Sequence, residues 1–181
     1  PISSEMTHLR PDLLPGLLAA AARNQARGFM DLSLFEIGPA FQGGEPGDQH
    51  LQAAGLLIGA AAQRDPHGSR RMVDVFDAKA DAEAVLAALG APARTQITRK
   101  AAQWWHPGRS GVISLGPNTM ATFGEVHPRI LQAMDVKGPA VAFTILIANI
   151  PAPKVKTPTR PALAISDLQA VDRDFAFVVD A

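Results

Sequence analysis

The chain has 181 residues, of which 47% are hydrophobic and 19% are charged. This length and composition allow one good-sized hydrophobic core, or one core with part of a second domain, and they argue against disorder over most of the chain. Lysine plus arginine equals aspartate plus glutamate at 17 each, so the uniformly basic surface of a self-sufficient nucleic-acid binder is not expected. Any contact with RNA must therefore be local.

The absence of cysteine excludes disulfides, thiolate zinc sites and cysteine nucleophiles. It fits a cytoplasmic protein, which is the location that we expect. No apolar run approaches the roughly 20 residues that are needed to cross a bilayer, so we expect no membrane contact. The chain does not start with methionine and it stops inside a predicted strand, so we expect it to be a piece of a longer polypeptide.

An amphipathic helix is predicted over residues 15–26, where a first-turn proline loses no hydrogen bond. Leucine and alanine residues recur at the spacing of one helical face. They are Leu14, Leu17, Leu18, Ala21 and Ala22. Packing on the chain's own sheet and contact with a partner subunit explain this pattern equally well, because apolar periodicity does not say which surface is covered.

A strand is predicted over residues 32–42, which read LSLFEIGPAFQ. Hydrophobic side chains would line both of its faces, so we expect it in the middle of a sheet. A turn-rich loop over residues 43–48 leads to a second strand over residues 51–59, which we expect to pair with the first in antiparallel fashion.

A second helix is predicted over residues 77–89, with Asp77 as its cap and an ion pair between Lys79 and Glu83. Asp77 and Asp81 resemble a metal pair, but acids in a first helical turn usually complement the helix dipole. The remaining predicted elements are an edge strand over 96–100, a hairpin of strands 111–115 and 120–126, a short helix over 128–134 and a strand over 140–150. Because this order lacks regular βαβ alternation, we expect an α+β fold with a largely antiparallel sheet.

The segment over residues 151–161 contains four prolines and three basic residues and is predicted to be an extended linker. Beyond it, a new strand is predicted over residues 174–179. We therefore expect a core domain over residues 1–150, a proline-rich linker over 151–165 and the start of another domain over 166–181.

Six stretches occur together and in a fixed order. They are RPDLLPGLL (10–18), LFEIGPAF (34–41), FDAKADAEAVLAALG (76–90), HPGRSG (106–111), FGEVHPRIL (123–131) and DRDFAFVVD (172–180). Together they closely resemble the C-terminal half of the bacterial phenylalanyl-tRNA synthetase β subunit. The region resembles the synthetase-like core domain of that subunit, and the final residues resemble the start of its ferredoxin-like anticodon-binding domain.

This resemblance implies an antiparallel sheet flanked by helices, of the class II aminoacyl-tRNA synthetase type. In that family the α subunit binds phenylalanine, ATP and the acceptor end of the tRNA, and the β core domain packs against it in an (αβ)2 heterotetramer. The resemblance thus implies part of a phenylalanine-tRNA ligase, with ATP and Mg used by the whole complex. For this region itself it implies no catalytic residue, no cofactor and no metal.

The residues at the class II signature positions agree with a loss of catalysis. In class II enzymes the strand of the second motif continues into Phe-Arg-x-Glu, whose arginine holds the α-phosphate of ATP. Here the strand continues as Phe41-Gln42-Gly43-Gly44-Glu45, and the third motif, which ends in Glu-Arg, has no counterpart around residues 140–150. Because removing one preorganised donor typically costs on the order of 2.7 to 4 kcal/mol of transition-state stabilisation, we expect a scaffold. The alternatives are a tRNA-contacting module and, less favoured, an active ATP-dependent ligase domain.

The remaining candidate residues are histidines, cations and one helix face. His106 and His127 each precede proline and are expected to shape a turn and a helix start, and Glu125 and His127 are expected on one strand face, where they can form a hydrogen-bonded pair. Candidates for a subunit interface are Arg10, Leu14, Leu17, Leu18 and Ala21. Candidates for RNA phosphate contact are Arg109, Lys154, Lys156 and Arg160, although charged linkers are usually only solvated.

Overall fold

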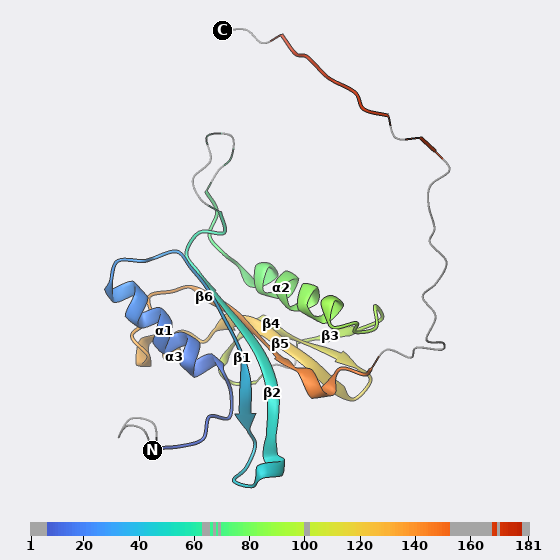
Figure 1. Cartoon of the computed structure of the whole chain (residues 1–181). Helices are drawn as coiled ribbons and strands as arrows, with labels where there is room; N and C mark the ends of the chain where they lie inside the picture. The colour runs from blue at the N-terminus through green and yellow to red at the C-terminus, as the bar shows by residue number, and fades with distance from the viewer. Residues whose placement is uncertain are drawn as a thin grey trace.

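The computed structural model describes residues 7–62, 66, 68, 70–99, 102–152, 168–169 and 171–178. Within them lies a six-stranded antiparallel sheet with the strand order β1-β2-β6-β5-β4-β3 (Figure 1). The strands are β1 (Leu32–Phe41), β2 (Gln49–Ile58), β3 (Gln96–Thr98), β4 (Trp105–Leu115), β5 (Asn118–Val126) and β6 (Ala140–Leu146). The helices are α1 (Leu14–Ala26), α2 (Val75–Ala88) and α3 (Pro128–Ala133), with short 3-10 turns η1 (Pro46–Asp48) and η2 (Ile147–Asn149). The predicted α+β fold with an antiparallel sheet is confirmed.

Helices cover both faces of the sheet. One face, which carries Leu56 and Ile58 of β2, packs against α1 and α3. The opposite face, which carries Phe143 and Ile145 of β6, packs against α2 (Figure 1). Because successive side chains of a strand point to opposite faces, a strand that is covered by both layers is apolar throughout. This explains the continuous hydrophobic run of β6.

The apolar side of α1 is buried in the chain's own core. The four predicted interface residues Leu14, Leu17, Leu18 and Ala21 all belong to the core cluster that contains Leu56 of β2. Of the two explanations for the helical pattern, the structure supports packing on the chain's own sheet for these side chains. At the other end of α1, the side-chain amide of Gln25 donates to the carbonyl of Lys137 and accepts from its N–H, which fixes the helix to the loop before β6.

The prediction that β1 lies mid-sheet is wrong. β1 pairs with β2 and is an edge strand of the described sheet, whereas β6 and β5 occupy the middle. Phe35 is 80% exposed and Ile37 is 62% exposed, so one face of β1 is not covered. The sequence pattern correctly indicated that both faces of β1 are apolar. Apolar character alone does not show that another element covers each face.

The start of α2 also differs from the prediction. The N-cap is Asp74, whose side chain accepts from the N–H groups of Phe76 and Asp77, and the helix begins at Val75. Asp77 is the third residue of the helix and accepts from the N–H of Asp74, which completes a capping box. The predicted pair of Lys79 and Glu83 is confirmed at 2.9 Å.

The other elements are close to their predicted positions. β4 is longer than expected and starts at Trp105, with an irregular register between Trp105 and Ser110. β6 ends at Leu146, where the chain turns into η2. Most of the predicted linker lies outside the described residues. The strand predicted over 174–179 is not formed in the described part, where 171–178 have no regular structure, because a strand needs a partner to satisfy its backbone groups.

We expect the contact between α1 and the sheet to dominate stability. Leu18 is 2% exposed in this contact, so Leu18→Ala should lower the free energy of unfolding by about 2–5 kcal/mol, through lost burial and the cavity left behind. The matched control is Leu9→Ala, because Leu9 is 56% exposed and its truncation should change stability by no more than about 0.5 kcal/mol. Urea unfolding of both variants measures the difference, and equal losses would contradict this account of the core.

Candidate functional site

The position of the missing second-motif arginine lies in the turn after β1. Gln42 is exposed, and its backbone N–H donates to the carbonyl of Asp48 at 3.0 Å. The Asp48 carboxylate accepts from the N–H of Glu45 at 3.0 Å and lies so close to Gly43 that a side chain there would overlap it. The loop is therefore closed by its own carboxylate, which leaves it poorly suited to hold a phosphate.

Arg10 lies along the free edge of β1. Its backbone carbonyl accepts from the N–H of Phe41 at 2.9 Å, and its Nε donates to the carbonyl of Pro39 at 2.8 Å. The guanidinium also forms an ion pair with Glu36 at 2.5 Å. Gly38 permits this approach, because a Cβ there would lie 2.6 Å from the guanidinium. Arg10, a predicted interface residue, is thus already engaged within the chain, and its contact with a partner stays a prediction.

A polar cluster that the sequence reasoning missed lies where α1 meets β2. The Gln52 side chain accepts from the N–H of Leu13 at 3.1 Å and donates to the Asp12 carboxylate at 3.3 Å. Asp12 also accepts from the N–H of Leu14 at 2.8 Å. Burial raises the pKa of the Asp12 carboxyl, although these hydrogen bonds oppose the effect. The available signal was Gln52 itself, a polar residue at an inward position of an apolar strand.

This cluster has a structural role at the start of α1. The first N–H groups of a helix have no partner within the helix, and Gln52 and Asp12 satisfy two of them at the start of α1. His50 lies nearby, and its buried Nδ1 has no hydrogen-bond partner among the residues that the structure describes. Among the described residues, no group of three or more His, Cys, Asp or Glu side chains could hold a metal ion.

The two histidine-proline steps have the structural roles that were expected. His106 Nδ1 accepts from the N–H of Gly108, and His127 Nδ1 accepts from the N–H of Arg129 at the start of α3. The expected pair of Glu125 and His127 is replaced by another one, because the Glu125 carboxylate accepts from Arg109 at 2.6 Å. The difference arises because β5 ends at Val126, so that His127 belongs to the cap of α3.

The predicted RNA-contact residues are not brought together by the described structure. The Arg109 side chain is 57% exposed on β4 and pairs with Glu125, and such a surface pair contributes little to stability. Lys154, Lys156 and Arg160 lie outside the described residues. RNA contact therefore stays a prediction.

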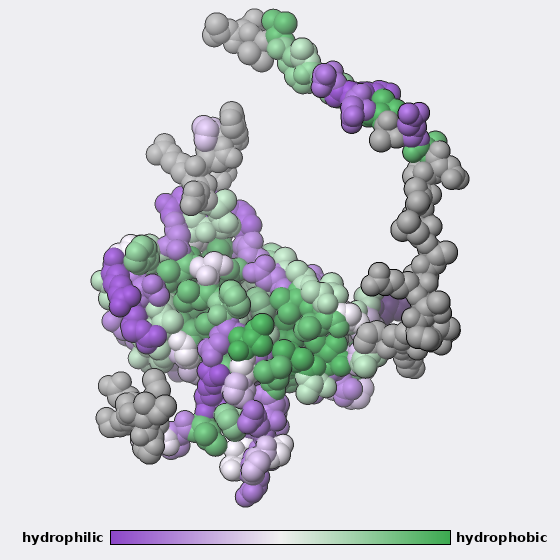
Figure 2. All heavy atoms as spheres, in the orientation of Figure 1, coloured by the Kyte–Doolittle hydropathy of each residue, from purple (hydrophilic) through white to green (hydrophobic). Residues whose placement is uncertain are grey.

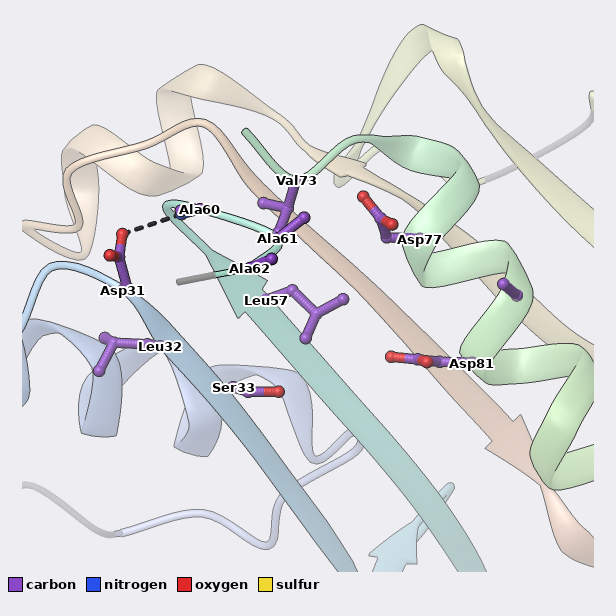
Figure 3. Close-up of a pocket in the computed structure, with 11 residues that line it drawn as sticks. Asp31, Leu32, Ser33, Leu57, Ala60, Ala61, Ala62, Val73, Asp77 and Asp81 are labelled. Atoms are coloured by element: carbon purple, nitrogen blue, oxygen red, sulfur yellow. Dashed lines mark hydrogen bonds between the residues drawn. The ribbon is translucent and has the colours of Figure 1, made fainter. Parts of the chain in front are cut away.

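A further hollow of about 430 Å³ lies between α2 and the first two strands (Figure 3). Asp81 extends from α2 toward Leu57 of β2, and Asp77 lies one turn earlier on the same helix (Figure 3). Asp31 lies at the other end of the hollow, where it accepts from the N–H of Ala60 (Figure 3). Asp31 pairs with Arg70 and Asp77 pairs with Arg71. Asp81 has no ion-pair or hydrogen-bond partner in the part of the chain that the structure describes. Burial raises its pKa, and the neighbouring Asp77 carboxylate raises it further.

Comparison with known proteins identifies the family of the chain. Residues 1–147 match the family model described as the phenylalanyl tRNA synthetase beta chain CLM domain. The chain belongs to this family. The match covers most of the region predicted to be the core domain, and it confirms the resemblance of that region, which holds five of the six ordered stretches.

Individual relatives agree with the family assignment. The chain is 80% identical over 181 residues to a phenylalanine-tRNA ligase beta subunit from Cereibacter sphaeroides, and 68% identical over 182 residues to one from Ruegeria pomeroyi. All of the chain is covered in both cases, but it spans only 22% and 23% of the length of these relatives.

A solved structure supports the fold. Pyrrolysyl-tRNA synthetase from Desulfitobacterium hafniense matches this CLM-family chain with a TM-score of 0.56 at 15% sequence identity. The match covers 76% of this chain and 47% of that protein. The sheet therefore has the class II synthetase architecture that the resemblance implied. No helix in the described ranges is long and apolar enough to cross a membrane.

The raised pKa of Asp12 leads to a pH-dependent stability difference. Below the unfolded-state pKa of about 3.9 the buried carboxyl is neutral in both states, and the stability that it contributes is lost as the pH rises through its higher folded-state pKa. We therefore expect wild type, relative to Asp12→Asn, to be more stable near pH 4 than near pH 7. Urea unfolding at both pH values measures this. The control is Asp172→Asn, at an exposed site, for which the difference in unfolding free energy from wild type should be the same at both pH values. A stability advantage of wild type over Asp12→Asn that grows toward pH 7 would contradict the burial of the Asp12 carboxyl.

Proposed function

We propose that this chain is the core domain of the β subunit of a phenylalanine-tRNA ligase, the enzyme that attaches phenylalanine to tRNA-Phe in an ATP-dependent reaction. The family match over residues 1–147 and the 80% identity to a named β subunit support the proposal. The proposal concerns the whole enzyme, because the chain corresponds to less than a quarter of such a subunit.

Within that enzyme, the chain acts as a non-catalytic scaffold. The observation that carries this conclusion is Gln42, a neutral amide at the position where class II enzymes use an arginine to hold the α-phosphate of ATP. The neighbouring guanidinium of Arg10 does not replace it, because Glu36 and the Pro39 carbonyl already bind it. Adenylate formation needs preorganised cationic donors at the phosphate, so the sheet retains the architecture without the groups that the reaction requires.

The proposed assembly follows the family pattern. The partner is the α subunit in an (αβ)2 heterotetramer, ATP and Mg are used at the α active site, and tRNA-Phe is bound by the complex, in the cytoplasm. Residues 1–150 form the core domain, 151–165 a linker and 166–181 the start of an anticodon-binding domain. The exposed and unstructured state of residues 171–178 agrees with a segment that is completed by further chain.

The scaffold role is tested by ATP–pyrophosphate exchange. We expect no phenylalanine-dependent exchange by this chain alone. Gln42→Arg should not restore it, because one guanidinium does not rebuild both lost motifs. The α subunit of the same organism, co-expressed with a β subunit that contains this chain, should give exchange and a stable complex.

Two results would overturn the proposal. Exchange by the isolated chain would identify it as an active ligase domain. Failure of the α subunit to form a complex with a β subunit that carries this region would remove the assembly role. The complex that contains the Gln42→Arg β subunit is the matched control, and it should exchange at the rate of the unaltered complex.

A further inference from the structure

On the side of α2, the described residues leave the edge strand β1 and the adjoining part of β2 exposed. α2 packs chiefly on β6 and β5, so the outer strands β1 and β2 extend beyond it. The register pairs Ser33 with Leu57, Phe35 with Gly55, Ile37 with Ala53 and Pro39 with Leu51, and all eight residues lie on this side. We call them the open face. Phe35, Ile37 and Leu51 are its exposed large hydrophobic residues.

The open face is shaped as a groove. A hollow lined by Phe35, Leu57 and Phe143 continues into the one that contains Asp81, and the two share Ser33, Leu57 and Asp81 in their linings. The Phe143 ring lies so close to Gly55 that a side chain there would overlap it, which keeps the floor flat. Figure 2 shows hydrophobic residues gathered over β2 and beside α2 in the same region.

The dimensions of the groove suit one helix. Strands in a sheet lie about 4.7–4.9 Å apart, so β1 and the adjoining β2, which Phe143 and η2 cover in part, span a surface about 10 Å wide. Packed helices have interaxial distances of about 8–10 Å. The side of α2 that borders the groove carries Ala80 and Ala84, whose small side chains allow another helix to approach closely.

The carboxylate of Asp81 favours a segment with a basic side chain in the groove. Asp77 is already paired with Arg71, whereas Asp81 has no partner among the described side chains. An occupant with a lysine or arginine opposite Asp81 and apolar residues toward β1 and β2 would satisfy both features. The relatives are more than four times as long as this chain, which supplies a covalently attached source for such a segment at high effective concentration.

We propose that an amphipathic helix from another part of the same, longer polypeptide lies in this groove beside α2, with a basic side chain paired to Asp81. The open face is then part of the domain core, and α2 and the added helix together cover that side of the sheet. The proposal does not depend on the catalytic or scaffold role of the chain.

Cysteine labelling tests the proposal, because the chain contains no cysteine of its own. Ala84→Cys places a thiol at the groove, and Ala93→Cys places one at an exposed position after α2 as the matched control. Each is made in this 181-residue chain and in the Cereibacter sphaeroides β subunit with its matched region replaced by this sequence. Maleimide labelling rates are read by peptide mass spectrometry at each position.

We expect the thiol of Ala84→Cys to react at least about tenfold more slowly in the longer polypeptide than in the 181-residue chain, while that of Ala93→Cys reacts equally in both. Adding Asp81→Lys to the longer polypeptide should reverse most of the protection of this thiol, because the new lysine would face the basic side chain of the added helix. In the 181-residue chain the same Asp81→Lys substitution measures the direct effect of the lysine on the nearby thiol, and the loss of protection in the longer polypeptide is judged relative to that rate.

Three results would overturn the proposal. Equal labelling of Ala84→Cys in both polypeptides, with protection only after the α subunit is added, would assign the groove to the partner subunit. Equal labelling of Ala84→Cys under all conditions would show that no segment occupies the groove. Slow labelling already in the 181-residue chain would mean that this chain covers the groove itself.

Discussion

The burial of α1 against β2 and β1 is the contact on which the rest of the structure depends. It places Leu13 and Leu18 against Leu56, and it brings the unpaired N–H of Leu13 to the side chain of Gln52. This polar contact inside an apolar contact surface fixes the position of the helix along the strand, because a shift would leave the buried N–H of Leu13 without its partner. With this face packed by the chain's own helix, the described residues leave Phe35 and Ile37 exposed on the opposite face of β1.

Several arginines are likewise engaged in contacts within the chain. Arg10 pairs with Glu36, Arg71 with Asp77 and Arg109 with Glu125, and each pair joins segments that are separate in the fold or fixes the start of a helix. Exposed pairs of this kind contribute little to stability. Their functional consequence is larger, because a guanidinium held by a carboxylate is a poor ligand for a phosphate. The guanidinium groups of Arg10, Arg71 and Arg109 are thus already engaged within the chain.

The sequence predicted the elements well because their signals are local. Pro15 with the periodic leucines defines α1, and Gly116 with Pro117 defines the turn between β4 and β5. Strand order was not predictable in the same way, since β2 pairs with β6, about 90 residues away, and this depends on the whole packing. The error over β1 has that origin. The cap at Asp74 was missed because Asp74 and Asp77 both fit the pattern, and the cluster of Asp12 and Gln52 was missed because its members are 40 residues apart.

The proposed loss of catalysis is compatible with the contacts that hold the fold together. The architecture depends on apolar burial by α1, α2 and α3, and none of these contacts requires a charge at the position of Gln42. Replacing an arginine by glutamine at an exposed turn costs the fold almost nothing, whereas it removes most of the stabilisation that a phosphoryl oxygen would receive. Under the proposed scaffold role, selection for assembly would preserve the core and the apolar surface of β1 and β2, and would leave the position of Gln42 free to change.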